Sequence, residues 1–245
     1  DDPEVDWSAF DVIAVRSCWD YTSRRDEFVA WCHSVGRRLR NSADIVEWNS
    51  DKTYLRDLSD AGVSIIPTIW DASTSSELGA HRSWVVKPTI SSGSANTAHW
   101  TTADAALAHS QELLAAGKHT MTQPYIASID TVGEFANYLF AGAYSHTVRK
   151  PALLEADQTP DQAASFPSGL RSADINEEML EFSREVVATA ERLTGQRIVQ
   201  ARVDVVLDQE DRPMLMELEL VEPALFLDFA PQAAAKYIQA ITGQS

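Results

Sequence analysis

The sequence predicts a mixed α/β protein, and three features support this class. A buried apolar run at residues 10–16 precedes apolar positions at helical spacing over residues 24–39, which gives one β–loop–α unit. A second amphipathic helix is expected over residues 175–194. Strand-like runs interrupted by short turns at residues 134–150 and 202–223 predict two antiparallel hairpins.

Shorter elements follow the first β–loop–α unit. Asn49 or Ser50 is expected to cap a helix that runs to residue 61, because short polar side chains satisfy the free amides of a first helical turn. The apolar run at residues 63–67 predicts a strand. Residues 71–82 are small and polar, and predict a loop.

A second group of short elements occupies the middle of the chain. The run at residues 83–87 predicts a strand that Pro88 breaks, followed by a flexible hairpin or lid with the sequence TISSGSANT. An Ala- and Leu-rich stretch predicts a helix over residues 103–116. Residues 121–126 contain Pro124, which favours an edge strand or a connector because proline cannot donate to a ladder.

The C-terminal part contains the longest predicted helix. Asp174 and Glu177 resemble a capping box at its start, and Leu193 is expected to face inward. The stretch 151–171 reads as a long polar loop without a cation before its last residue. The tail predicts a final helix over residues 231–241.

Composition limits the classes of function. The chain has 245 residues, 44% of them hydrophobic, and a net charge of −16, which argues against nucleic-acid and anionic-membrane partners. No signal peptide is visible, and the apolar runs are far shorter than the roughly 20 residues of a membrane span. Cys18 and Cys32 lack a CxxC partner, so a zinc site is not expected, and free thiols fit a reducing, cytoplasmic location.

Three acidic residues in apolar runs form the strongest functional signal. Asp204 lies among valines, while Glu217 and Glu219 alternate with apolar residues and therefore share one face of a strand. Carboxylates in such surroundings are costly unless a positive charge neutralises them. Oxygen ligands alone favour Mg²⁺, with Mn²⁺ as the alternative ion. The competing interpretation is an exposed sheet face with ordinary surface charge.

The hairpin register decides between these interpretations. If Leu207 lies opposite Met214, then Asp204 lies opposite Glu217 and Arg202 opposite Glu219, and these four charged residues face the same way. Pro213 is then expected in the turn, outside the ladder. With this register, a metal site is the preferred interpretation of the three acids.

Basic residues elsewhere are ambiguous when taken singly. Lys87 ends an apolar strand before a Ser- and Gly-containing loop whose amides could bind phosphate, although a P-loop motif is absent. Lys52 lies near a helix start, where a cation opposes the helix dipole. Arg149 and Lys150 point to opposite strand faces, so only one can enter a shared site. His146 is a candidate base, but a structural histidine is the preferred interpretation.

The loop after the first predicted strand is a candidate substrate site. Arg16, Trp19, Asp20 and Tyr21 follow the carboxyl end of that strand, where open α/β sheets place their ligands. Local packing of the two aromatic residues explains the pattern equally well.

The ordered set of motifs resembles the ATP-grasp superfamily. It comprises WNxDKxYL from residue 48, VVKP with the following Ser/Gly loop, QPYI at 123–126, the GE pair that opens the hairpin at 134, and a final D…ELE hairpin. The resemblance covers nearly the whole chain. It points to the glutathione-synthetase-like and RimK-like ligases, and within them to the D-cycloserine ligase (O-ureido-serine cyclo-ligase) type.

The resemblance implies an α+β ATP-grasp fold and a role for each matching residue. Lys52 and Lys87 would contact the ATP phosphates, Lys87 also lying near the adenine, under a loop that includes Ser92, Gly93 and Ser94. The connector Gln123, Pro124, Tyr125 and Ile126 would bind the adenine edge, and Glu134 the ribose. Asp204, Glu217 and Glu219 would bind two Mg²⁺ ions, and Lys150 and Arg202 would stabilise the transferring phosphoryl group.

The same resemblance implies an organisation and a chemistry. An incomplete N-terminal α/β domain (1–45) would precede a central subdomain (46–122) and a C-terminal subdomain with the metal site (123–245), which together clamp the nucleotide. A small-molecule carboxylate would become an acyl phosphate and then react with an amine or another nitrogen nucleophile, as in an amino-acid or peptide ligase or a cyclo-ligase. Relatives carry a further strand–helix unit before residue 5, and their counterparts of 71–82 and 151–171 are longer. A non-catalytic nucleotide-binding module and a plain α/β binding protein are the alternatives, and a homo-oligomer is left open.

Overall fold

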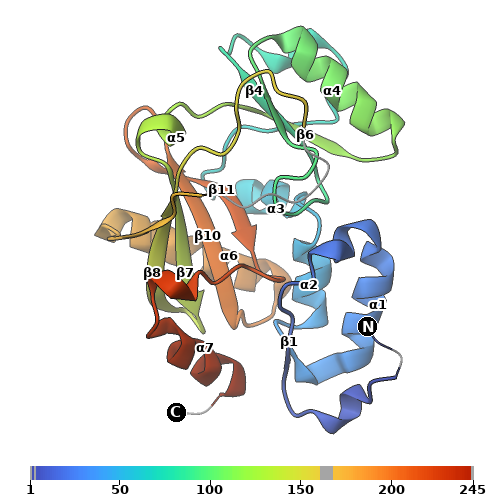
Figure 1. The fold of residues 1–245 in the computed structure, drawn as a ribbon, viewed down its shortest axis with the longest axis vertical. Coiled ribbons are helices and arrows are strands. Elements are labelled where there is room, and N and C mark those ends of the chain that lie inside the picture. Colours follow the sequence, from blue (N-terminus) through green and yellow to red (C-terminus); the bar gives the residue numbers. More distant parts are fainter. Residues whose placement is uncertain (1, 3, 161–167, 244–245) are drawn as a thin grey trace.

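The computed structural model describes residues 2, 4–160 and 168–243, arranged in three sheets with helices on their outer faces (Figure 1). The part of the 151–171 loop that covers 161–167 lies outside the described residues. None of the helices in the described ranges has the length and apolar character that a bilayer crossing requires.

The N-terminal part is a small α/β unit. The parallel pair β1 (Ile13–Ala14) and β2 (Leu39–Arg40) is connected through α1 (Arg25–Val35), and α2 (Ala43–Asn49) follows. Burial of Cys32, Val35 and Leu39 unites the helix and the strands in one apolar cluster. The predicted β–loop–α unit is therefore confirmed, but its helix ends earlier than expected, because Gly36 terminates it with a positive φ of 63°.

The central sheet has the strand order β3–β6–β4–β5. Its strands are β3 (Ile69–Trp70), β4 (Trp84–Pro88), β5 (Ala98–Trp100) and β6 (Thr120–Pro124). The predicted helix over 103–116 is present as α4 (Ala103–Ala115), and it packs on this sheet through Ala106 and Leu113 (Figure 1). The interpretation of residues 121–126 as an edge is wrong, because β6 lies between two strands and Pro124 is its last residue.

The C-terminal sheet has five antiparallel strands in the order β11–β10–β7–β8–β9. They are β7 (Glu134–Phe140), β8 (Ala143–Lys150), β9 (Arg171–Ala173), β10 (Gln200–Leu207) and β11 (Pro213–Glu219). Both predicted hairpins are present. The helices α6 (Glu177–Thr194) and α7 (Ala233–Thr242) pack against this sheet, while α5 (Ser128–Thr131) is a single turn before β7.

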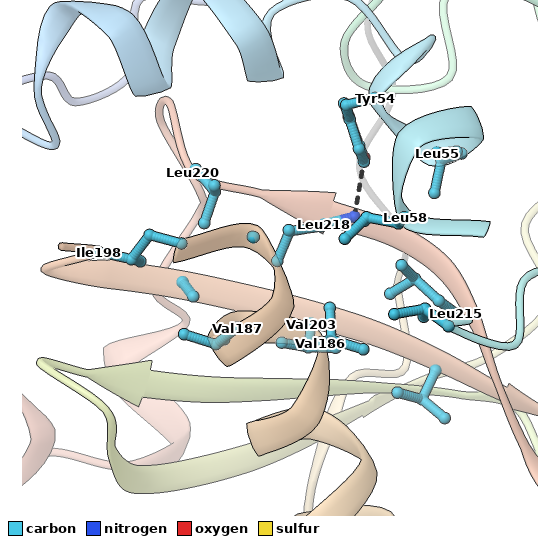
Figure 2. Close-up of a cluster of buried hydrophobic side chains, with 14 of the residues drawn as sticks. Tyr54, Leu55, Leu58, Val186, Val187, Ile198, Val203, Leu215, Leu218 and Leu220 are labelled. Carbon is cyan, nitrogen blue, oxygen red and sulfur yellow. Dashed lines mark hydrogen bonds between the residues drawn. The ribbon is translucent and has the colours of Figure 1, made fainter. Parts of the chain in front are cut away.

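The main core lies between β10, β11 and the helices α3 (Tyr54–Asp60) and α6 (Figure 2). Fully buried leucines at positions 55, 58, 215, 218 and 220 fill it. Two details of the predicted α6 were wrong. Asn176, not Asp174, caps it by accepting from the Met179 amide at 2.8 Å, and Leu193 is 43% exposed because it lies in the last turn.

The edge strand β11 is completed by side chains instead of a further strand. The Asn49 Nδ2 donates to the Leu218 carbonyl at 2.8 Å, and the Leu220 amide donates to the Asn49 Oδ1 at 2.7 Å. The expected cap of the helix that runs to residue 61 is therefore wrong, because Asn49 and Ser50 end α2, while α3 begins at Tyr54 after Thr53, whose side chain makes no capping bond. The predicted strand at 63–67 is reduced to one bridge between Ile65 and Leu215.

Tyr54→Phe is expected to lower the free energy of unfolding by about 1 to 3 kcal/mol. The buried Tyr54 hydroxyl accepts from the Leu218 amide at 2.8 Å (Figure 2), and the phenylalanine would leave that amide without a partner. Denaturant unfolding measures the change. Tyr144→Phe, which alters a half-buried hydroxyl, is the control. Equal stability of Tyr54→Phe and the wild type would contradict the importance of this bond.

Candidate active site

Three carboxylates meet on the hairpin formed by β10 and β11. Asp204 pairs with Glu217 and Arg202 with Glu219, as the sequence predicted. One oxygen of each of Asp204, Glu217 and Glu219 lies within 4.8 Å of the others. Antiparallel pairing brings opposite residues to one face, so the cluster follows from the register.

The register near the turn differs from the prediction. Leu207 pairs with Pro213, not with Met214, and a β-bulge at Met216 absorbs the difference before Asp204. Pro213 is consequently the first residue of an edge strand, a position that proline tolerates. The bulge places both Leu215 and Leu218 in the core and turns Met216 toward the site chamber, which corrects the expected alternation.

Basic side chains surround the acids. Arg202 donates to Asp204 at 2.7 Å and also pairs with Glu219, while Lys150 lies 2.9 Å from Asp204 and pairs with Glu134. The opposite-face prediction is confirmed, because Arg149 points away and donates to the Thr131 carbonyl at 2.9 Å.

A third cation, Lys52, reaches the cluster from the turn before α3. Its ammonium lies 3.3 Å from Glu217 and donates to the Ser91 carbonyl at 2.6 Å. Lys52 thereby links the acid cluster to the β4–β5 loop.

Burial and charge divide the acids into two groups. Burial raises the pKa of Glu219 to about 7, although Arg202 opposes the shift, and it raises the pKa of Glu134 to about 7 against Lys150. For Asp204, burial also favours the neutral form, but Arg202 and Lys150 prevail and hold its pKa well below the usual range. A divalent cation would favour the charged form of every carboxylate that it contacts. The all-oxygen donor set fits Mg²⁺.

Lys87 lies at the end of β4 beside this cluster. It is buried, and within the described ranges of the chain its ammonium has no hydrogen-bond or ion-pair partner. Burial lowers the pKa of Lys87, although Glu217 counteracts the shift. A buried ammonium that faces a chamber is suited to an anionic ligand.

The β4–β5 loop covers one side of the chamber. Gly93, Ser94 and Asn96 adopt positive φ values of 57°, 60° and 56° in tight turns. The Ser92 hydroxyl donates to the Trp19 carbonyl at 3.2 Å, which ties this loop to the N-terminal unit. Backbone amides of such a loop can bind phosphate oxygens.

The connector 123–126, which begins in the last two residues of β6, forms another wall. The Gln123 amide donates to the Thr68 hydroxyl at 2.9 Å, and the Tyr125 ring stacks on His99 with centroids 3.9 Å apart. Tyr125 also donates to Asp130 at 2.5 Å. The connector is thus fixed from both sides.

One chamber collects most of the predicted site residues. Every predicted nucleotide-binding, metal-binding and catalytic residue lines it, together with Trp19 and Tyr21. Two predicted substrate residues do not line it. Asp20 is exposed on the surface, and the Arg16 guanidinium donates to the Pro223 carbonyl at 2.6 Å and lies over the Tyr237 ring. The structure therefore gives Arg16 a positioning role.

His146 on β8 has a structural role, which is the interpretation that the sequence favoured. His146 is buried, stacks on Tyr138 with centroids 4.2 Å apart, and makes a 3.0 Å hydrogen bond through Nε2 to the Leu225 carbonyl. Burial lowers its pKa. It does not line the chamber.

Glu222 and Phe226 stand out among the chamber residues that sequence reasoning did not assign to the site. Glu222 is 7% exposed, and Phe226 adopts a positive φ of 46°. The signal for Glu222 was present, since it is a fourth acid in the apolar run after β11. Phe226 had no sequence signal, because its conformation depends on the path of the chain after residue 219.

The fold and the chamber together define an ATP-grasp enzyme. The structure matches a Bacillus anthracis D-alanine–D-alanine ligase complexed with ATP at a TM-score of 0.64 and 16% identity, over 88% of this chain and 72% of that one. It matches the crystal structure of D-cycloserine synthetase DcsG at a TM-score of 0.90 and 33% identity, over 100% and 87% of the two chains.

The sequence comparisons identify the family. The chain is 34% identical to the cycloserine biosynthesis protein DcsG of Streptomyces lavendulae, over 98% of this chain and 85% of that protein. A family profile for the N-terminal domain of D-cycloserine synthetase DcsG matches residues 1–41. The chain belongs to the D-cycloserine synthetase family of ATP-grasp ligases, and it is an ATP-dependent ligase that joins a carboxylate to an amine.

Proposed function

We propose that the chamber binds Mg-ATP between its lysines and its acid cluster. The observation that carries the proposal is the convergence of three carboxylate oxygens within 4.8 Å beside Lys52 and the unpaired Lys87. In this proposal Lys52, Lys87 and the loop residues Ser92, Gly93 and Ser94 hold the phosphates. The connector residues 123–126 hold the adenine, and Glu134 holds the ribose.

Asp204, Glu217 and Glu219 would hold two Mg²⁺ ions. When bound, the ions would neutralise the phosphate oxygens and polarise the transferring phosphoryl group. Solved relatives support this: the structure matches an ATP-grasp ligase, PsnB, described with Mg and ADP, at a TM-score of 0.58 and 17% identity, over 89% of this chain and 68% of that one.

The proposed reaction has two steps. A substrate carboxylate oxygen attacks the γ-phosphorus of ATP, and the bond between this phosphorus and the β–γ bridging oxygen breaks. ADP departs with the electron pair of that bond, and the substrate becomes an acyl phosphate. A nitrogen attacks the acyl carbon, inorganic phosphate leaves with the C–O electron pair, and the nitrogen loses a proton. Arg202 and Lys150 supply positive charge where the equatorial phosphoryl oxygens gain negative charge.

We propose further that the carboxylate and the nitrogen belong to one small amino-acid derivative. Support comes from the relative described as D-cycloserine synthetase, since cycloserine is a cyclic amide of a serine carboxyl group. An intramolecular reaction needs a chamber that holds one folded substrate and excludes water. Trp19 and Phe226 line the chamber and would form an apolar wall on the substrate side.

ADP release with Mg-ATP tests this function. Each enantiomer of O-ureidoserine is compared with serine plus hydroxylamine, and we expect release with one enantiomer only. Mass spectrometry of the product then detects a cyclised molecule. ADP release only with separate carboxylate and amine substrates would overturn the intramolecular proposal, and binding of Mg-ATP without any turnover would favour a non-catalytic module. Oligomeric state and the cytoplasmic location stay predictions.

Lys87→Ala is expected to raise the KM for ATP by about 10- to 100-fold. A lysine–phosphate interaction in a buried site is a charge-assisted hydrogen bond, which contributes about 1.5 to 3 kcal/mol. The KM for ATP is measured by steady-state ADP release at saturating carboxylate substrate. Lys118→Ala, on the exposed turn after α4, is the control. An unchanged KM in Lys87→Ala would count against its phosphate role.

A further inference from the structure

The segment that follows β11 is held in place without a strand partner. We call residues 220–225 the strap. Five side chains from separate elements bind five of its six carbonyl groups: Asn41 to Leu220, Gln200 to Val221, Arg16 to Pro223, Tyr138 to Ala224 and His146 to Leu225, at 2.8, 3.2, 2.6, 2.5 and 3.0 Å. So many side-chain bonds to consecutive carbonyls fix the strap backbone beside the chamber.

The strap presents one charged side chain to the chamber. Glu222 is 7% exposed and lines the same chamber as the acid cluster. Among the described residues, its carboxylate has no hydrogen-bond partner except its own backbone amide, and no cation lies within ion-pair distance. Burial raises the pKa of Glu222 to about 8, and the neighbouring Glu219 adds to the shift.

The two cations that act electrostatically on Glu222, Lys52 and Arg202, are already engaged. Lys52 pairs with Glu217 and donates to Ser91, and Arg202 is held by Asp204 and Glu219. Glu222 also lies outside the group of three acids whose oxygens converge. A buried carboxylate that no protein cation neutralises is costly, so a ligand that supplies a cation would gain from binding there.

From this arrangement we propose that Glu222 binds the α-ammonium group of an amino-acid substrate whose carboxylate is activated at the acid cluster. The inference rests on the proposed function, since it concerns the carboxylate substrate of the same chamber. The α-ammonium and the carboxylate of an amino acid are separated by one carbon. Glu219 is the last residue of β11 and Glu222 lies three residues further along, on the fixed strap, so in this proposal the two substrate groups are held by neighbouring parts of the chain.

Equilibrium titration tests the inference independently of turnover. The full chain, with Mg²⁺ and a non-hydrolysable ATP analogue, is titrated with O-ureidoserine and with the counterpart that lacks the α-amino group. We expect the wild type to prefer the amino compound by about 30-fold, which corresponds to one charge-assisted hydrogen bond of about 2 kcal/mol. Glu222→Gln should reduce the preference to about 3-fold or less.

Two further variants separate recognition from structure. Glu222→Asp keeps the charge and should retain a preference of about 10-fold, which a purely structural role would not predict. Asp228→Asn removes an exposed acid six residues further along and should behave as the wild type.

The results of the titration and of ADP release test the ammonium site and the proposed reaction separately. Equal affinity of the wild type for both compounds, binding of neither, or an undiminished preference in Glu222→Gln would overturn the inference. If the wild type binds the amino compound selectively but releases no ADP with it, the ammonium site stands and the proposed cyclisation of that compound fails.

Discussion

Glu217→Gln is expected to reduce Mg-dependent ATP turnover by about 10²- to 10³-fold while the fold is retained. Glu217 lies opposite Asp204 in the hairpin and 3.3 Å from Lys52, so it contacts both the acid cluster and a phosphate-binding candidate. Glutamine keeps the shape but removes the negative charge that would hold a divalent cation. Losing one preorganised electrostatic contact in a buried site typically has an effect of this size.

The Mg²⁺ dependence of turnover in Glu217→Gln distinguishes a loss of metal binding from a loss of folding. ADP release is measured over a range of Mg²⁺ concentrations, and we expect half-saturation to move to higher concentration in Glu217→Gln. Glu210→Gln, in the exposed turn of the same hairpin, is the matched control. Thermal unfolding without metal should be similar for Glu210→Gln and the wild type, and Glu217→Gln should still unfold cooperatively although it loses the contact to Lys52. Turnover equal to the wild type in Glu217→Gln would refute the metal assignment.

The acid cluster was predictable because it depends on local pattern. Alternation along two strands placed Asp204 opposite Glu217 and Arg202 opposite Glu219, and the structure agrees. The bulge at Met216 was not predictable, because it follows from packing of Leu215 and Leu218 against α3 and α6. The predicted partner of Leu207 was consequently wrong by one residue although the charged pairs were right.

The strap could not be predicted for a related reason. Its carbonyl groups are bound by side chains at positions 16, 41, 138, 146 and 200, and no periodicity connects these positions. The same cause explains Asn49, whose polar side chain resembles a helix cap in the sequence but completes the edge of β11 in the structure. Polar residues whose partners are distant in sequence have no local signature.

The loop after β1 shows what the position of a residue in the sequence does not predict. Its position after a strand indicated a ligand site, and Trp19 and Tyr21 do line the chamber. Position alone could not tell which side chains point inward. Asp20 faces solvent, and Arg16 contacts the strap instead of the chamber.

Arg202→Met is expected to lower turnover by about 10³-fold and to destabilise the protein by about 3 to 5 kcal/mol. Arg202 is buried and donates to Asp204 at 2.7 Å, and it also pairs with Glu219. Methionine would fill a similar volume but leave two carboxylates without that cation. Removing one member of a buried ion pair has a cost of this size, because the remaining charge stays buried.

The effect of Mg²⁺ on stability distinguishes a catalytic cation from a structural one. Arg202 pairs with Asp204 and Glu219, and in the proposed metal site a divalent cation would neutralise the same acids, so Mg²⁺ should raise the melting temperature of Arg202→Met more than that of the wild type. Turnover should stay low even when Mg²⁺ restores the stability, because a bound ion would not replace the guanidinium that we propose to face the transferring phosphoryl group.

Arg202→Lys keeps the positive charge and provides the matched control. A lysine cannot make the forked contact to a carboxylate, so we expect intermediate stability and turnover closer to that of Arg202→Met than to the wild type. Thermal unfolding with and without Mg²⁺, together with ADP release, measures both quantities. Full recovery of turnover in Arg202→Met at saturating Mg²⁺ would show that Arg202 only balances the charge of the acids, and the proposed role in phosphoryl transfer would then belong to Lys150 alone.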